Sequence, residues 1–143
     1  MFISDTKPNR ERYQKTIGIY LCVTLFTALF GGVYEVFGHG VFSFPMLYAF
    51  AFPLAGGVAP FFLLMTHRKA YPSSLSTGAY HAGIATLTVG SLVSGALEIY
   101  GTESPLLIVY QIVGAALVLI GILTYLILGG ILRSAKQKRS SEA

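Results

Sequence analysis

The chain has 143 residues, enough for one domain, but 54% of them are hydrophobic and only 11% are charged, which excludes an ordinary soluble domain. The net charge of +4 comes from basic residues that flank the apolar stretches. We attribute this excess to contact with anionic lipid heads and expect no nucleic-acid binding. A single cysteine, Cys22, excludes an intrachain disulfide.

Four stretches carry no Asp, Glu, Lys or Arg, and each is long enough for a membrane helix, which needs about 20 apolar residues. They lie between Lys15 and Glu35, Glu35 and Arg68, Lys69 and Glu98, and Glu103 and Arg133. Backbone groups in hydrocarbon must pair within their own segment, so these stretches are predicted to be helices. The predicted spans are residues 16–37, 44–65, 77–100 and 105–132. The fold class that follows is all-α: one integral membrane domain over residues 1–143, built as a four-transmembrane-helix bundle of two tandem hairpins.

The first span follows a polar, basic tail, residues 1–15, which is predicted to be disordered or interfacial. The span itself is too long for the apolar region of a signal peptide. The second span contains Pro45, Pro53 and Pro60, with two glycines between the last two, and should be kinked or locally unwound. The fourth span has no interior proline and should be straighter, with a short polar tail from residue 136 onward.

All ten basic residues fall in the N-terminal tail, the connection between the second and third spans, or the C-terminal tail. They are Lys7, Arg10, Arg12, Lys15, Arg68, Lys69, Arg133, Lys136, Lys138 and Arg139. The positive-inside rule then predicts an N-in/C-in topology, in which the two short turns at residues 38–43 and 101–104 face outward.

An internal repeat relates the two hairpins. Shifting the sequence by 63 positions lays residues 28–38 over residues 91–101, and Glu35 then meets Glu98. Because both hairpins begin and end on the same side, we expect a pseudo-two-fold axis along the membrane normal.

Small residues accompany the glutamates in both copies. Ala28, Gly32 and Glu35 lie at i, i+4 and i+7, a spacing that puts them on one helix face. The second copy has Ser91, Gly95 and Glu98 in the same places. Because small residues let membrane helices approach closely, the first and third spans are predicted to pack together along this stripe, with the glutamates near each other.

Two carboxylates close together in a poorly solvated place cannot both ionise at low cost. We therefore expect one of them to hold a proton, or a cation to lie between them, with the identity of any metal open. Tyr34, His39 and Tyr100 are near in sequence and complete the predicted ion- or proton-binding site. In the alternative reading, Glu35 and Glu98 lie within a turn of the helix end, where water and headgroups solvate them.

No spacing typical of a metal, nucleophile, phosphate-loop or dinucleotide site occurs, so no cofactor and no enzymatic activity are expected. The histidines are divided between the two ends: His39 lies in an outer turn, while His67 and His81 lie toward the cytoplasm. Aromatic residues near the predicted interfaces are interpreted as membrane anchors. They include Tyr13, Tyr20, Phe37, Tyr48, Tyr71, Tyr80 and Tyr100.

The segments GIATLTVGS (residues 83–91) and LEIYGT (residues 97–102) resemble uncharacterised four-span membrane proteins of Gram-positive bacteria. The resemblance covers mainly the third span. It implies a bacterial plasma membrane and carries no activity that could be transferred.

These observations favour a small multi-pass membrane protein with an outward-facing carboxylate site that binds a proton or cation for ion or solute passage. The partners expected are the lipid bilayer and either further copies of the chain or a larger membrane complex. The alternative is a non-transporting accessory, a partner-stabilising or immunity-type membrane protein, whose small-residue faces contact another protein.

Overall fold

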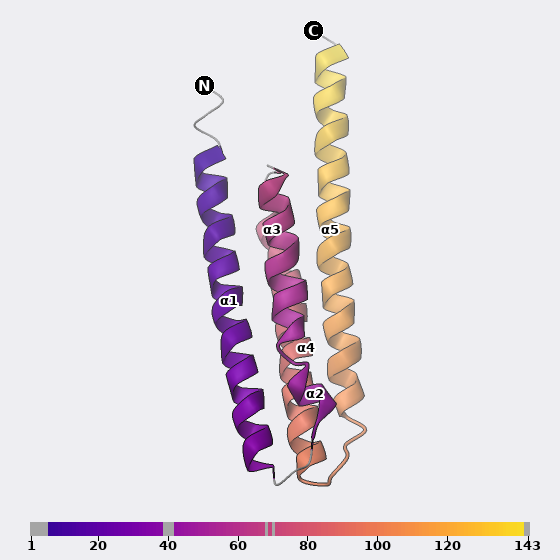
Figure 1. Ribbon diagram of the computed structural model, residues 1–143. Coiled ribbons are helices and arrows are strands. Elements are labelled where there is room, and N and C mark those ends of the chain that lie inside the picture. Colours follow the sequence, from indigo (N-terminus) through magenta and orange to yellow (C-terminus); the bar gives the residue numbers. More distant parts are fainter. Residues whose placement is uncertain (1–5, 39–41, 68, 70, 142–143) are drawn as a thin grey trace.

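The computed structural model describes residues 6–38, 42–67, 69 and 71–141, and over these ranges it is all-helical, which confirms the predicted fold class. Four segments are long and apolar enough to cross a membrane: Asn9–Phe37, Phe44–Thr66, Ser74–Ile99 and Leu107–Ser141. They run side by side as a bundle (Figure 1). The architecture is that of a small multi-pass membrane protein.

The first helix, α1 (Thr6–Phe37), begins ten residues before the predicted span, so the polar tail is helical from Thr6 onward. Arg10, Glu11 and Lys15 favour helices, and Pro8 falls in the first turn, where a proline is tolerated. With 32 residues, α1 is about 48 Å long at ~1.5 Å per residue, more than the roughly 30 Å of the hydrocarbon core. Its first turns therefore continue beyond the membrane.

The second span is broken into three pieces, which confirms the predicted local unwinding. They are α2 (Phe44–Leu47), the π-helical segment η1 (Phe52–Val58) and α3 (Ala59–Thr66). Pro60 has no N–H to offer to the carbonyl of Gly56, four residues earlier. The hydroxyl of Tyr80, from a neighbouring helix, donates to that carbonyl at 2.6 Å. A side chain thus satisfies a backbone group that the proline leaves free.

The second hairpin consists of α4 (Ser74–Ile99) and α5 (Leu107–Ser141), which pack along each other over most of the bundle. Glycines allow the close approach, since a Cβ on Gly83 would lie 2.6 Å from the backbone nitrogen of Val118. The Ser76 hydroxyl donates to the carbonyl of Gly121 at 2.8 Å and adds a polar tie between the two helices.

Helix α5 extends beyond the predicted fourth span. The span was expected at residues 105–132 with a polar tail after it, but the helix begins at Leu107 and continues to Ser141. Its 35 residues amount to about 52 Å at ~1.5 Å per residue. Lys, Arg and Gln in the last turns are good helix formers, so the loss of apolar character does not end the helix.

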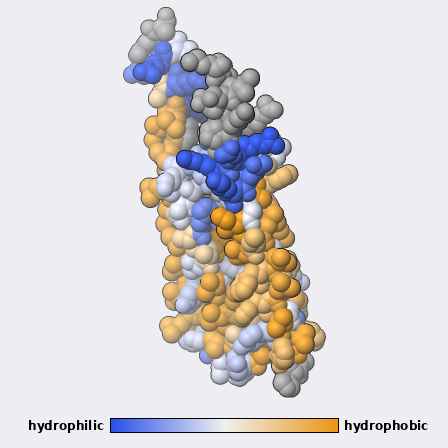
Figure 2. Space-filling view, turned by 90° about the vertical axis from the view of Figure 1, so that its left-hand side faces the viewer, coloured by the Kyte–Doolittle hydropathy of each residue, from blue (hydrophilic) through white to orange (hydrophobic). Residues whose placement is uncertain are grey.

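Both termini and the connection between α3 and α4 lie at one end of the bundle, which we call the basic end (Figure 1). The strongly hydrophilic surface gathers there, above a largely apolar surface (Figure 2). This arrangement agrees with the predicted pairing of the termini on one side. Which side of the membrane it faces stays a prediction, as does the pseudo-two-fold axis.

The predicted small-residue contact between α1 and α4 is wrong. Space around Gly32 is open, because a Cβ placed there would meet nothing within 4 Å. Gly95 is buried, but a Cβ there would lie 2.4 Å from the Cβ of Met46, which belongs to α2. A Cβ on Gly31 would lie 3.0 Å from the Met46 carbonyl oxygen. The second span therefore inserts Met46 between α1 and α4, and the glycines that make room are Gly31 and Gly95.

Candidate functional site

The predicted site residues lie at the end of the bundle opposite the basic end. Glu98, near the end of α4, is exposed, and its Oε2 accepts a hydrogen bond of 2.7 Å from the Ser43 hydroxyl. Ser43 itself is fully buried, just before α2. The chain from the first to the second span thus supplies a donor that sequence reasoning did not include, and it reaches Glu98 across the bundle.

Glu35, near the end of α1, has a different environment. Its side chain is partly buried, and its Oε1 atom is buried with no hydrogen-bond partner among the described residues. Buried polar atoms are nearly always paired in native proteins, so a carboxylate oxygen in this condition calls for a proton, an ion or a water. The two glutamates are therefore not equivalent, although the repeat predicts that they are.

The tyrosines beside the glutamates do come together. The side chain of Tyr34 forms a hydrogen bond with Tyr100, which joins the ends of α1 and α4. His39, the remaining member of the predicted site, lies outside the described residues. Within the described part of the chain, no group of three or more His, Cys, Asp or Glu side chains is placed to hold a metal ion.

A cluster of aromatic side chains, some with hydrogen-bonded polar groups, lies in the half of the bundle toward the basic end. It was not predicted from the sequence. Phe61 is its centre, with 3% of its surface exposed. Its ring lies 5.3 Å from the ring of His81 and 6.0 Å from that of Tyr20, both stacked on it. The Tyr20 hydroxyl and Nδ1 of His81 share a hydrogen bond of 2.5 Å. An ionisable residue paired inside a membrane-spanning segment is a candidate functional group by default.

Further tyrosines close this cluster toward the basic end. The Tyr13 hydroxyl donates to the Lys69 carbonyl at 3.3 Å, and Tyr71 shares a hydrogen bond of 2.9 Å with Thr16. Tyr13 and Tyr20 are buried. Four tyrosines that were interpreted as membrane anchors, Tyr13, Tyr20, Tyr71 and Tyr80, instead pack inside the bundle and pair their hydroxyls there.

The spacing on α1 contained a signal for this cluster. Tyr13, Tyr20 and Thr27 are separated by seven residues each, which puts them on one helix face, and all three are buried. A groove of about 390 Å³ follows this face between α1 and α4. The polar residues of its lining are Thr16, Tyr20, Thr27, His81 and Thr88.

Comparison with known proteins adds no family to this description: no protein-family model, curated protein or solved structure matches the chain.

Proposed function

We propose that this membrane protein binds a proton or a cation at Glu35 and that the site serves ion or solute passage. The observation that carries the proposal is the buried Oε1 atom of Glu35, which has no hydrogen-bond partner in the described structure. An ionised carboxyl group is costly when one of its oxygens is out of contact with water and unpaired. A proton on the carboxyl group, or a cation bound to it, removes that cost.

The surroundings support uptake of positive charge. The sequence has no Lys or Arg between Lys15 and Arg68 or between Lys69 and Arg133, so no Lys or Arg side chain neutralises this end of the bundle, and His39 is the one residue of the predicted site that could carry a positive charge. Glu98, held by Ser43, provides a second acidic group at the same end.

Infrared difference spectroscopy of the purified protein at neutral pH tests the proposal. We expect a protonated-carboxyl band that disappears in Glu35→Gln and persists in Glu98→Gln. If a cation occupies the site instead, the wild type should gain thermal stability when that cation is added, and Glu35→Gln should not. If neither a Glu35-dependent band nor a Glu35-dependent response to a cation is observed, Glu35 is a solvated interfacial charge. The proposal would then be wrong.

A second candidate function, that of an accessory to a partner membrane protein, is favoured by the outer face of α1. Ala28 and Gly32 lie on an open face of this helix, in a shallow groove of about 310 Å³ formed by α1 residues alone. Small residues on an open face are what a second helix needs to approach closely.

The accessory function predicts a complex with a different chain in native membranes solubilised in mild detergent. Gly32→Leu should dissociate that complex, whereas Gly18→Leu, also an open position on α1, should leave it intact. A complex that contains only copies of this chain would contradict the accessory function and agree with the homo-oligomer expected from the sequence.

A further inference from the structure

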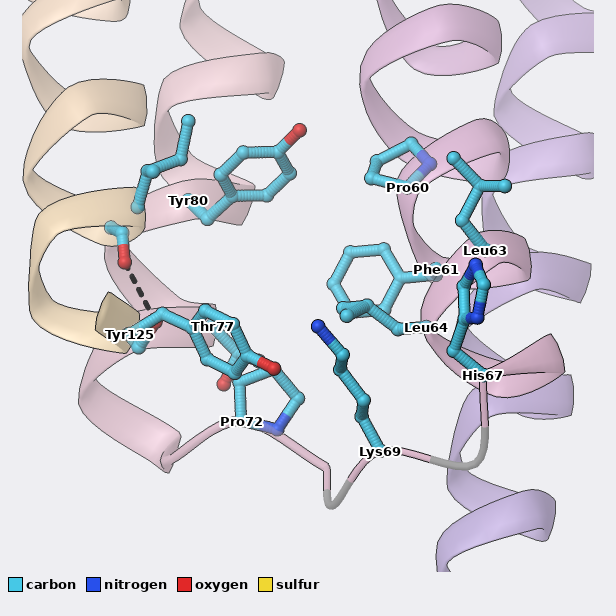
Figure 3. A pocket seen from close by; sticks show the side chains of 13 residues that line it. Pro60, Phe61, Leu63, Leu64, His67, Lys69, Pro72, Thr77, Tyr80 and Tyr125 are labelled. Atoms are coloured by element: carbon cyan, nitrogen blue, oxygen red, sulfur yellow. Dashed lines mark hydrogen bonds between the residues drawn. The ribbon is translucent and has the colours of Figure 1, made fainter. Parts of the chain in front are cut away.

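A cavity of about 370 Å³ opens between α3 and α5 near the basic end (Figure 3). It exists because α5 packs along α4 and makes no comparable contact with α3, so the two helices diverge around it. Its volume lies in the range of roughly 300–1,000 Å³ that is typical of small-molecule sites. The cavity is far from Glu35, which lies at the opposite end of α1.

The walls of the cavity are apolar. Phe61 and Leu64 of α3 face Ile122 of α5 across it, with Pro60 deeper in the bundle. The hydroxyls of Ser76, Thr77 and Tyr80 in the lining are already used, since each donates to a backbone carbonyl. His67 also lines the cavity, but it is exposed just after the end of α3. The interior therefore offers a surface for a hydrocarbon chain and little else.

The mouth of the cavity is charged and polar. Figure 3 shows the ammonium group of Lys69 and the hydroxyl of Tyr125 pointing toward each other across the opening, from the α3–α4 connection and from α5. No acidic residue is among those that line the cavity. A cation and a hydroxyl donor at the rim of an apolar slot are complementary to an anionic head attached to an apolar tail.

We propose that this cavity binds one anionic phospholipid, with an acyl chain between α3 and α5 and the phosphate on Lys69 and Tyr125. Leu63 and Ile122 of the lining are exposed on the sides of membrane-spanning segments, so an acyl chain would reach the slot from the side without crossing water. Inorganic phosphate would contact only the polar groups at the mouth and would gain nothing from the apolar interior. A zwitterionic lipid would bring its own cation close to Lys69, which disfavours it relative to an anionic one.

Native mass spectrometry of the full chain, delipidated in detergent, provides the test. The probes are dioleoyl phosphatidylglycerol, dioleoyl phosphatidylcholine and inorganic phosphate. We expect one phosphatidylglycerol to be retained, at least about tenfold more tightly than phosphatidylcholine, and no effect of inorganic phosphate on its binding. Lys69→Ala should reduce the affinity for phosphatidylglycerol to that for phosphatidylcholine, whereas Lys15→Ala, an exposed cation of the same end, should not change it.

A pair of tryptophan variants tests the slot itself. Ile122→Trp should fill the cavity and weaken both lipids, while Ile120→Trp, exposed on the same helix and outside the cavity, should weaken neither. Circular dichroism shows whether each variant keeps its helices. Equal retention of the two lipids, equal effects of Lys69→Ala and Lys15→Ala, or full binding by Ile122→Trp would each overturn the proposal. Because none of these readouts involves Glu35, they are independent of the proton or cation site.

Discussion

The hydrogen bond between Tyr20 and His81 joins α1 to α4 in a region where the backbones of these two helices do not pack closely. Phe61 stacks against both rings, so the pair is enclosed by apolar surface. Gly57 makes this possible, because a Cβ there would lie 2.1 Å from the Tyr20 ring. A directional bond in such surroundings fixes how α1 and α4 are placed relative to each other, a role that the small-residue stripe was expected to fill.

Removing the hydroxyl from this pair should destabilise the bundle. We expect Tyr20→Phe to lower the free energy of unfolding by about 1–3 kcal/mol, because Nδ1 of His81 loses its partner in the interior. The measurement is denaturant unfolding in detergent micelles, followed by circular dichroism. Tyr48→Phe is the matched control, since Tyr48 is exposed, and an equal loss in both variants would contradict the prediction.

Among the elements, α2 has an effect out of proportion to its four residues. It carries Met46, of which 1% is exposed, into the space between Gly31 of α1 and Gly95 of α4. The helix is interrupted after α2 and resumes as η1 and α3. The prolines of the second span therefore allow one membrane span to contain both the short inserted helix α2 and the longer helical segment of η1 and α3. The glycines on the flanking helices are the complementary part of that arrangement.

This arrangement separates two glycines that the repeat treats alike. Gly95→Ala should lower the free energy of unfolding by about 1–3 kcal/mol, because the added methyl group would overlap Met46 and force α2 away from α4. Gly32→Ala should leave stability unchanged or slightly higher, since that position is open and alanine favours helices. The same unfolding measurement decides between them: a larger loss for Gly32→Ala would restore the predicted α1–α4 stripe.

Considered as a whole, the molecule is polarised along its axis: the described Lys and Arg side chains lie at one end, accompanied by Glu11, and the other described glutamates lie toward the opposite end. The described basic side chains lie on the first turns of α1, the last turns of α5 and the connection between α3 and α4. Glu35, Glu98 and Glu103 lie toward the other end. Combined with the positive-inside rule, this polarity predicts that the basic end faces the cytoplasm.

Cysteine labelling in intact cells checks that orientation. In a background without Cys22, a membrane-impermeant thiol reagent should modify a cysteine at position 102 from outside and spare cysteines at positions 69 and 138. All three residues are exposed in the structure, so a lack of labelling reports the membrane and not burial. External labelling at position 69 with protection at position 102 would reverse the predicted topology.

The sequence predicts the fold class well because apolar length is a property of each span by itself. It does not predict where α1 begins or α5 ends, since helix formers such as Arg10 and Lys136 continue a helix into water without any apolar signal. The insertion of Met46 between Gly31 and Gly95 depends on contacts among three spans, and no local sequence pattern predicts it. The tyrosines were misinterpreted because an aromatic ring near a membrane surface and one inside the bundle look alike in a hydropathy profile. The seven-residue spacing of Tyr13, Tyr20 and Thr27 was the pattern that distinguished them.

The length of α5 has a mechanical consequence. The helix is continuous from Leu107 to Ser141, so the portion that follows Leu132 extends the part inside the bilayer without a break. A small change in the tilt of α5, such as one that accompanies widening of its gap with α3, becomes a sideways displacement at Ser141. A probe on the exposed Lys138 would therefore read out, from the aqueous phase, rearrangements that occur deep in the membrane.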